Sequence, residues 1–280
     1  MAQLSDIAAQ LRHADPDRYL SALYAPEDKR GALFALYAFN AEIASIRDRI
    51  HEPLPGEIRL QWWRDIITAG TPESAGGYPL ATALLSAIHE YALPLPAFDN
   101  YMETRIFDLY DDPMPSRTDL EGYCGETASV LIQLASFVLD RTAASGVSEL
   151  AGHAGCAQAI AGLLRHLPLH RSRGQCYVPE DILAASGSSV ATLLEGKNTG
   201  ALGRVVSAMT SLAREHLAAF KSAAATIPPT LRPAFLPVAL VPAYLDAIDR
   251  RGARAALEVV DIPAWKRHWL LFRAAGRGWG

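Results

Sequence analysis

The chain has 280 residues, 50% of them hydrophobic and 20% charged, which is the balance of a globular protein with ample material for a core. Its formal net charge of -4 excludes the broad basic field of a nucleic-acid binder. We therefore expect no nucleic-acid partner.

Apolar residues recur at steps of three and four along the first 70 positions, which is the spacing of one helix face. A first helix is predicted to begin after Ser5. A long helix is predicted to follow Pro26 and to reach about Ile50, because proline and acidic residues suit a helix start. Another is predicted to begin after Pro55 and to end at Gly70.

The rest of the chain shows the same periodicity, with a capping-box pattern from Thr118 to Glu121 at the head of one helix. Further helices are predicted over 79–92, 95–111, 118–143, 148–166, 198–226, 230–250 and 262–275. The segment from Leu167 to Pro179 contains two prolines and is predicted to be an ordered loop, briefly extended over 175–178. No repeat or strand pair is evident, so the sequence predicts an all-α protein with one domain over residues 1–280.

Three cysteines are too few for a disulfide framework and too scattered for a zinc site, which predicts reduced thiols in a cytoplasmic protein. The first residues lack the basic stretch and apolar run of a secretory signal. No uncharged stretch reaches the ~20 apolar residues of a membrane span, so we expect any membrane contact to be peripheral. The C-terminal segment mixes tryptophans with basic residues, which suits a membrane interface, a partner surface or a plain amphipathic closing helix.

Three different motifs occur at characteristic spacings along the chain. The first combines D-R-Y-L-S from Asp17, P-E-D-K-R from Pro26 and L-Y-A-F from Leu36. The second is Y-C-G-E-T-A from Tyr123, and the third runs from L-L-R at Leu163 to R-G-Q-C-Y-V-P. In pattern and spacing these motifs resemble the squalene/phytoene synthase family over nearly the whole chain.

The resemblance implies a single large helical bundle of the isoprenoid synthase type around a central cavity. Members of the family join two prenyl diphosphates head to head, and two D-x-x-x-D motifs on facing helices hold the Mg²⁺ ions that grip the diphosphates. A four-residue spacing puts both carboxylates of a motif on one helix face, and Mg²⁺ prefers such oxygen ligands.

The residues that match these two motifs depart from the family pattern. In the first motif, Ala44 and Ser45 stand at the leading aspartate positions and only Asp48 remains. In the second motif, His166 and His170 replace the aspartates. Departure of diphosphate has little help without a metal to neutralise its charge. We therefore expect a pseudoenzyme, a non-catalytic binding or assembly factor, as in the branch of the family known as complex I assembly factors in mitochondria and α-proteobacteria.

The alternative is a head-to-head prenyltransferase of the squalene/phytoene synthase type with an altered site, acting on farnesyl or geranylgeranyl diphosphate. The assembly-factor branch implies a cytoplasmic protein, peripheral at the inner face of the membrane. It also implies a protein partner in respiratory complex assembly and an isoprenoid or lipid-like ligand. No catalytic residue is assigned. The predicted cavity and ligand-binding residues are Ser21, Tyr37, Ala44, Asp48, Tyr123, Arg165, His166, His170, Arg173 and Tyr177.

No cofactor is expected for a binding factor, and Mg²⁺ would be required only by a synthase. His166 and His170 are four residues apart, so a continuous helix would present both rings as a transition-metal pair, with Asp48 as the third ligand. Pro168 opposes this arrangement because it favours a helix end near His166, where both rings would instead bond nearby groups. The sequence leaves both alternatives open.

Several other side chains also have two interpretations. The three predicted site tyrosines could line a cavity or lie in the core, and the arginines at 165, 171 and 173 could hold an anionic head group. Trp62 and Trp63 resemble a family helix in which one indole packs in the core. Glu103, Arg105 and Asp108 fall at helical spacing and could form a buried ion pair or a polar patch.

Overall fold

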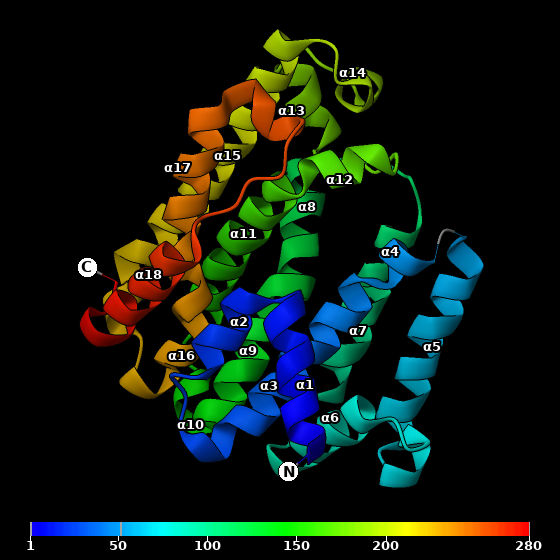
Figure 1. Cartoon of the computed structure of the whole chain (residues 1–280), viewed down its shortest axis with the longest axis vertical. Helices are drawn as coiled ribbons and strands as arrows, with labels where there is room; N and C mark the ends of the chain where they lie inside the picture. The colour runs from blue at the N-terminus through cyan, green and yellow to red at the C-terminus, as the bar shows by residue number, and fades with distance from the viewer. Residues whose placement is uncertain (1, 51, 280) are drawn as a thin grey trace. The chain divides into compact units, whose positions relative to one another are not determined.

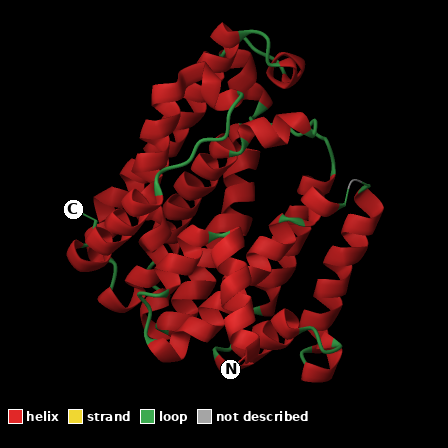
Figure 2. Cartoon of the chain, in the orientation of Figure 1, coloured by secondary structure: helices red, strands yellow, loops and turns green. Residues whose placement is uncertain are grey.

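A computed structural model describes residues 2–50 and 52–279, and every regular element in this part of the chain is a helix (Figure 2). The chain forms two compact units, each drawn from three separate segments. Unit 1 comprises Met1–Leu109, Val130–Ser148 and Ile227–Pro237, and unit 2 comprises Tyr110–Ser129, Glu149–Thr226 and Val238–Gly280. The all-α prediction is confirmed, and the assignment of one domain to 1–280 stays a prediction.

Unit 1 is organised around one helix, α3 (Glu27–Ala44). The other helices are α1 (Ala2–Ala14), α2 (Pro16–Ala22), α4 (Ile46–Arg49), α5 (Pro53–Ala69), α6 (Pro79–Glu90), α7 (Leu95–Arg105), α9 (Val130–Leu139), α10 (Arg141–Ala144) and α16 (Arg232–Phe235). Short 3-10 turns cover Pro72–Ala75, Ile106–Leu109 and Pro229–Leu231. Helices α1, α2, α6, α7 and α9 pack directly on α3, and the short α4 follows it in the chain and also contacts it (Figure 1).

An aromatic cluster joins α3 to α5 and α7. The Phe39 ring centroid lies 5.0 Å from that of Trp63 on α5. It lies 5.8 Å from Phe98 and 5.6 Å from Tyr101, both on α7. All four rings are buried, and burial of a large apolar side chain contributes about 1.5–3 kcal/mol. The prediction that one indole of the Trp62–Trp63 pair packs in the core is confirmed for Trp63.

Unit 2 contains α8 (Arg117–Cys124), a π-helical segment (Gly125–Ser129), α11 (Ser148–Arg165), α12 (Leu167–Ser172), α13 (Glu180–Ala185), α14 (Val190–Glu195), α15 (Thr199–Ala223), α17 (Val241–Arg251) and α18 (Ala264–Arg277). Its 3-10 turns cover Ala224–Thr226 and Gly252–Ala256, and another turn, Leu236–Leu240, precedes α17. The longest helix, α15, packs against α13, α14, α17 and the turn at Gly252–Ala256.

The π-helical segment brings α11 into unusually close contact. The Ser129 hydroxyl lies 3.3 Å from the Cys124 carbonyl oxygen and 3.1 Å from the Gly152 carbonyl oxygen on α11. A Cβ atom on Gly155 of α11 would lie only 2.5 Å from Ser129 Cα. Real Cβ atoms do not approach backbone this closely, so only glycine permits the contact.

Three predicted boundaries in the first half are wrong. The first helix begins at Ala2, before Ser5, and the third begins at Pro53. The long helix ends at Ala44, where the sequence predicted continuation to Ile50. Its end has a local cause: Ser45 has φ -90° and ψ 1°, and its hydroxyl donates to the Glu42 carbonyl oxygen at 2.9 Å. Serine competes with helix geometry in this way.

In the second half the chain is more finely divided than predicted. The N-cap of α8 is Ser116, which accepts from the Asp119 amide, so the predicted cap at Thr118 is wrong. The predicted loop over 167–179 begins with a helix, α12, because a proline is tolerated in the first turn. Helices α13 and α14 were not predicted. The predicted helix over 118–143 is interrupted at Gly125–Ser129 and at Asp140.

Two stretches, Arg117–Leu139 and Pro229–Ala256, are long and apolar enough by length and composition to cross a membrane, although each contains charged residues. The apolar windows of these stretches are 67% and 78% buried inside the protein, as in the core helices of a globular domain. The three cysteines are buried and form no disulfide in the described part of the chain, in agreement with the prediction of reduced thiols.

Replacing Gly155 by alanine should destabilise the protein by about 1–3 kcal/mol or more, because the new methyl group overlaps the Ser129 backbone. Chemical denaturation measures the change. Gly152 lies on the same helix and a Cβ there meets nothing within 4 Å, so Gly152→Ala is the control and should stabilise by up to about 1 kcal/mol. Equal stability of the two variants would contradict the close contact.

Candidate functional site

Four of the predicted site residues form a chain of ring contacts in unit 2. The Tyr123 ring centroid lies 5.8 Å from that of Tyr177, and Tyr177 lies 4.7 Å from His170. The His166 ring lies 6.5 Å from His170. Tyr123 is on α8, His170 is on α12, and Tyr177 is in the following loop. Both tyrosines are buried, so within unit 2 their rings pack as core side chains.

The loop that carries Tyr177 is held by main-chain hydrogen bonds. The Met114 amide donates to the Cys176 carbonyl oxygen at 3.1 Å, and the Glu180 amide donates to the Met114 carbonyl oxygen at 2.9 Å. These two bonds attach the loop on either side of the tyrosine to residue 114, and no strand forms among the described residues. The brief extension predicted over 175–178 stays a prediction, because these residues form no strand.

The two histidines flank a helix junction. Helix α11 ends at Arg165, and His166 has φ -99° and ψ 8° as the cap of α12. The His166 carbonyl oxygen accepts from the Leu169 amide at 2.9 Å and from the His170 amide at 3.1 Å. Pro168 lies in the first turn of α12, where no amide donor is required. The predicted helix end near His166 is confirmed.

His170 is held as a neutral imidazole. Burial, and to a smaller extent the neighbouring His166 and Arg173, lower its pKa from 6.5 to about 3. Its Nδ1 atom is buried and has no hydrogen-bond partner among the described residues. A neutral imidazole offers one donor and one acceptor but no charge.

The arginines beside the histidines have different roles. Arg171 donates to three main-chain carbonyl oxygens, those of Leu193 at 2.5 Å, Leu194 at 3.0 Å and Ala256. Two of these carbonyls lie in the last turn of α14, where a cation is favourable. Three of its five N–H groups are thus committed to the main chain, and the suggestion that Arg171 holds an anionic head group stays a prediction.

Arg165 is partly buried, and its guanidinium lies 3.8 Å from the centroid of the Tyr244 ring. It also donates to the Val260 carbonyl oxygen and to Asp261, both at 3.2 Å. Arg173, by contrast, is exposed. Of the three arginines, Arg173 is thus the one whose side chain reaches solvent most fully.

In unit 1, the predicted residues Ser21 and Tyr37 are buried. The Ser21 hydroxyl donates to the Asp17 carbonyl oxygen at 2.8 Å within α2. The Tyr37 ring centroid lies 6.0 Å from the Arg18 guanidinium, which pairs with Asp15 at 2.6 Å. Burial raises the pKa of Tyr37 well above its ordinary value, although Arg18 opposes the shift. Within unit 1 Tyr37 is therefore a neutral core tyrosine.

Ala44 and Asp48 occupy the end of α3 and the short helix α4, and both are exposed. The break at Ser45 lies between them, so they are not successive positions on one continuous helix face. The continuous helix face that the resemblance implies for a D-x-x-x-D motif is therefore absent at positions 44 and 48.

Sequence reasoning missed the role of Glu42. Its carboxylate accepts from Arg59 at 2.5 Å, from the Trp63 indole at 3.2 Å and from the Tyr78 hydroxyl. Burial and the bond to Glu42 raise the pKa of Tyr78 to about 12. The partners are 17 to 36 residues away, so no local spacing could indicate them. Glu42 ties α3 to α5 and to the residue before α6.

The alternative left open for Glu103, Arg105 and Asp108 is resolved for each residue. Arg105 pairs with Asp108 at 2.9 Å, and both side chains are largely buried. Glu103 is exposed and pairs with Arg64 at 2.5 Å. The helical spacing thus contains one buried ion pair and one separate surface pair.

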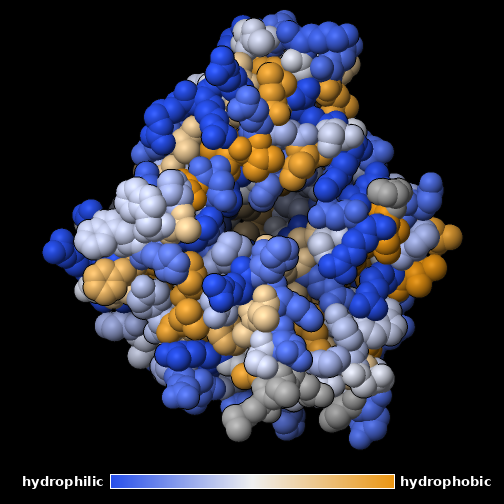
Figure 3. Space-filling model, in the orientation of Figure 1, coloured by the Kyte–Doolittle hydropathy of each residue, from blue (hydrophilic) through white to orange (hydrophobic). Residues whose placement is uncertain are grey.

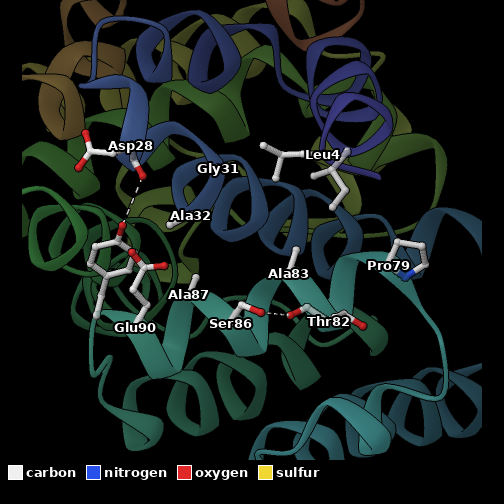
Figure 4. Close-up of a pocket in the computed structure, with 12 residues that line it drawn as sticks. Leu4, Asp28, Gly31, Ala32, Pro79, Thr82, Ala83, Ser86, Ala87 and Glu90 are labelled. Atoms are coloured by element: carbon white, nitrogen blue, oxygen red, sulfur yellow. Dashed lines mark hydrogen bonds between the residues drawn. The ribbon is translucent and has the colours of Figure 1, made fainter. Parts of the chain in front are cut away.

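A groove of about 360 Å³ in unit 1 was not predicted. It runs between α3 and α6, with Leu4 of α1 at one end (Figure 4). Small side chains line it, with the acidic Asp28 and Glu90 at the other end. The Tyr91 hydroxyl donates to the Asp28 carbonyl oxygen at 3.4 Å across this end.

Unit 2 also holds a histidine pair outside the predicted set. His153 Nδ1 lies 3.1 Å from His216 Nδ1, and His216 Nε2 lies 3.2 Å from Glu121. One ring must donate and the other accept, which fixes complementary tautomers. In the described part of the chain, no three His, Cys, Asp or Glu side chains form a group that could hold a metal ion. Asp48 belongs to unit 1 and His166 and His170 to unit 2, and a metal shared by these three residues stays a prediction.

A family model described as squalene/phytoene synthase matches residues 11–271 of the chain. The chain belongs to the squalene/phytoene synthase family. The match leaves out only short ends, which agrees with the resemblance of the three motifs. The all-α isoprenoid synthase type is confirmed as the fold class, and the central cavity stays a prediction.

Relatives within the family include complex I assembly factors. A protein from Bos taurus named "NADH dehydrogenase (ubiquinone) complex I, assembly factor 6" is 31% identical over 245 residues, which cover 86% of this chain and 72% of the relative. The protein of the same name from Homo sapiens is 30% identical with the same coverage. The predicted branch of the family is therefore confirmed.

Among solved structures, a dehydrosqualene synthase in complex with ligand matches with a TM-score of 0.81, covering 98% of this chain and 96% of that chain. Sequence identity is 17%, so this likeness shows the fold alone. The family scaffold is thus retained at low identity, while the histidines of α12 and its cap stand where the family resemblance implies aspartates.

The neutral state of His170 predicts a pH dependence of stability. Below pH 6.5 the unfolded chain binds a proton at this residue that the folded protein, with a pKa of about 3, does not accept. Stability should therefore fall as pH decreases from 6.5 towards 3, by about 2 kcal/mol from this residue at pH 5. His170→Phe should remove that part of the slope in denaturation measured against pH. His13→Gln, at an exposed ring, is the control, and an unchanged slope in His170→Phe would contradict the assignment.

Replacing Arg171 by methionine should destabilise the protein by about 2–4 kcal/mol, because three buried carbonyl oxygens lose a charged donor. The matched control is Arg173→Met, two residues away and exposed, which should change stability by less than about 0.5 kcal/mol. Thermal or chemical denaturation of both variants decides the matter. Similar losses in the two variants would show that Arg171 is not the structural arginine.

Proposed function

We propose that this protein is a non-catalytic member of the squalene/phytoene synthase family that acts as an assembly factor in the biogenesis of respiratory complex I. Relatives at 30% and 31% identity are named as complex I assembly factors, which supports this role. Its protein partner would be a component of that complex. We place the protein in the cytoplasm, peripheral at the inner face of the membrane, with an isoprenoid or lipid-like molecule as its ligand.

The observation that carries the proposal is the state of His170. The family resemblance implies an aspartate at this position, whose charge would help to hold Mg²⁺ on a diphosphate. Here the side chain is an imidazole, packed 4.7 Å from the Tyr177 ring, whose pKa of about 3 keeps it neutral at physiological pH. A neutral nitrogen ligand suits Mg²⁺ poorly and adds nothing to charge neutralisation. Ala44 and Ser45, at the corresponding positions of the first motif, add no carboxylate.

A binding factor of this kind would need no resident cofactor. Mg²⁺ belongs to the prenyltransferase alternative, and His166 with His170 offers two imidazoles to a transition metal, with Asp48 as the third ligand of that alternative. Elemental analysis of the purified protein separates these cases, because a stoichiometric transition metal would favour the histidine site.

Purified protein incubated with farnesyl or geranylgeranyl diphosphate, with and without Mg²⁺ and a reductant, should yield no C30 or C40 product. Analysis of the extracted lipids measures this, and an active squalene or phytoene synthase serves as the positive control. Metal-dependent formation of either product would overturn the proposal in favour of the prenyltransferase.

A genetic experiment in the organism that encodes this chain tests the assembly role directly. Deleting the gene should lower the amount of assembled complex I on native gels, and the wild-type gene should restore it. Ala44→Gly, a change at an exposed former motif position, should restore it as well, because no catalytic motif is in use. Normal complex I in the deletion strain would contradict the assembly role.

A further inference from the structure

The C-terminal helix α18 carries its aromatic residues on the outside. Trp265 is 71% exposed, Trp269 57% and Phe272 63%, whereas Arg267, Leu271 and Ala274 are buried. A plain amphipathic closing helix would bury its aromatic rings and expose its arginines. In α18 the opposite is found, because Arg267 is buried and all three aromatic rings are exposed.

Bonds within unit 2 fix this orientation. Arg267 donates to the Tyr244 hydroxyl at 3.2 Å and to Asp261 at 3.0 Å. Asp261 also accepts from Arg165, whose guanidinium stacks on the Tyr244 ring. Rotating α18 to bury its tryptophans would remove a buried arginine from these partners, and an unpaired buried charge is strongly unfavourable. The bonds of Arg267 therefore keep the three aromatic rings of α18 on the surface of unit 2.

The three rings form one stripe. Positions 265, 269 and 272 are spaced by four and three residues, so they lie on a single helix face. The Trp269 and Phe272 centroids are 6.3 Å apart, and with His268 the rings line one open apolar surface. The surface over α18, at the left of Figure 3, is pale to orange, with blue beside it. Contiguous exposed apolar area of this kind marks an interaction site.

The charges of α18 indicate what the stripe contacts. The helix contains no acidic residue. Lys266, Arg273 and Arg277 fall on one flank of the stripe, and the two arginines are exposed. Tryptophan and phenylalanine beside basic residues match the boundary of a bilayer, where rings enter the headgroup region and cations meet anionic lipid. An exposed aromatic stripe on a helix without acidic residues fits such an anionic surface.

We propose that α18 docks on a bilayer surface that carries anionic lipids, with Trp265, Trp269 and Phe272 inserted and the basic flank on the headgroups. This proposal specifies the peripheral membrane contact in the proposed function and rests on that localisation. Vesicle binding requires neither a protein partner nor a prenyl diphosphate. Its result is therefore separate from the product and assembly assays.

Flotation of the full chain with vesicles tests the proposal. Wild-type protein should float with vesicles in which about a third of the lipid is phosphatidylglycerol, and salt should weaken the binding. Tryptophan fluorescence should shift to shorter wavelength on binding. Replacing Trp265, Trp269 and Phe272 together by alanine should weaken binding at least about tenfold. Replacing Lys266, Arg273 and Arg277 together by glutamine should weaken it roughly a hundredfold on anionic vesicles only.

Two matched controls use exposed residues elsewhere. Leu54→Ala with Ile58→Ala removes an exposed apolar pair on α5, and Lys221→Gln with Arg250→Gln removes exposed charge from α15 and α17. Both should bind as wild type does, and circular dichroism checks that every variant is folded. If the aromatic variant fails to fold, the basic variant still decides. The proposal would be overturned if wild-type protein did not bind anionic vesicles, or if the α18 variants bound them as well as the controls do. It would also be overturned if α18 bound a protein partner and the protein bound no vesicles, because the aromatic stripe would then be a protein-binding surface.

Discussion

A charge withdrawn from water must be matched by partners, and this requirement holds the helices of both units in place. In unit 1, Glu42 gathers Arg59, the Trp63 indole and the Tyr78 hydroxyl, which ties α3 to α5. In unit 2, Arg171 joins α12 to the end of α14 and to the turn before α18. Hydrophobic burial supplies most of the driving force for folding, but it is non-directional. The matched charges therefore select which faces of the helices meet.

This contrast between non-directional burial and specific charge pairs explains which features could be predicted from the sequence. Helical periodicity depends on neighbours three and four residues apart, so the all-α class and most helices could be predicted. Breaks such as Ser45 depend on one hydroxyl bonding one carbonyl, and many serines inside helices do so without ending the helix. Glu42 illustrates a further limit, because its partners come together only after α5 and α6 have packed. The orientation of α18 has the same limit. Its sequence pattern is compatible with burying either the aromatic or the basic face, and the bonds of Arg267 to Tyr244 and Asp261 determine which face is buried.

The candidate site shows the same contrast. The motifs located the residues at 44, 48, 166 and 170, and the proline between the histidines correctly indicated a helix end. The sequence could not show that His170 is packed on Tyr177 and kept neutral, because its pKa depends on surroundings assembled from distant segments. At a position where the resemblance implies a charged aspartate, the folded chain thus carries a buried imidazole with a lowered pKa.

The contact between Gly155 and Ser129 has a mechanical consequence for unit 2. With a backbone atom of the π-helical segment lying where a side chain would begin, α11 cannot slide past that segment or turn about its own axis. Tilting is the motion that remains, with the glycine as pivot. His166 caps the helix that follows α11, eleven positions beyond this pivot, and Arg165 is the last residue of α11 itself. A small tilt at the glycine would therefore be amplified into a larger displacement of the histidines, and α11 would act as a lever whose long arm ends at the candidate site.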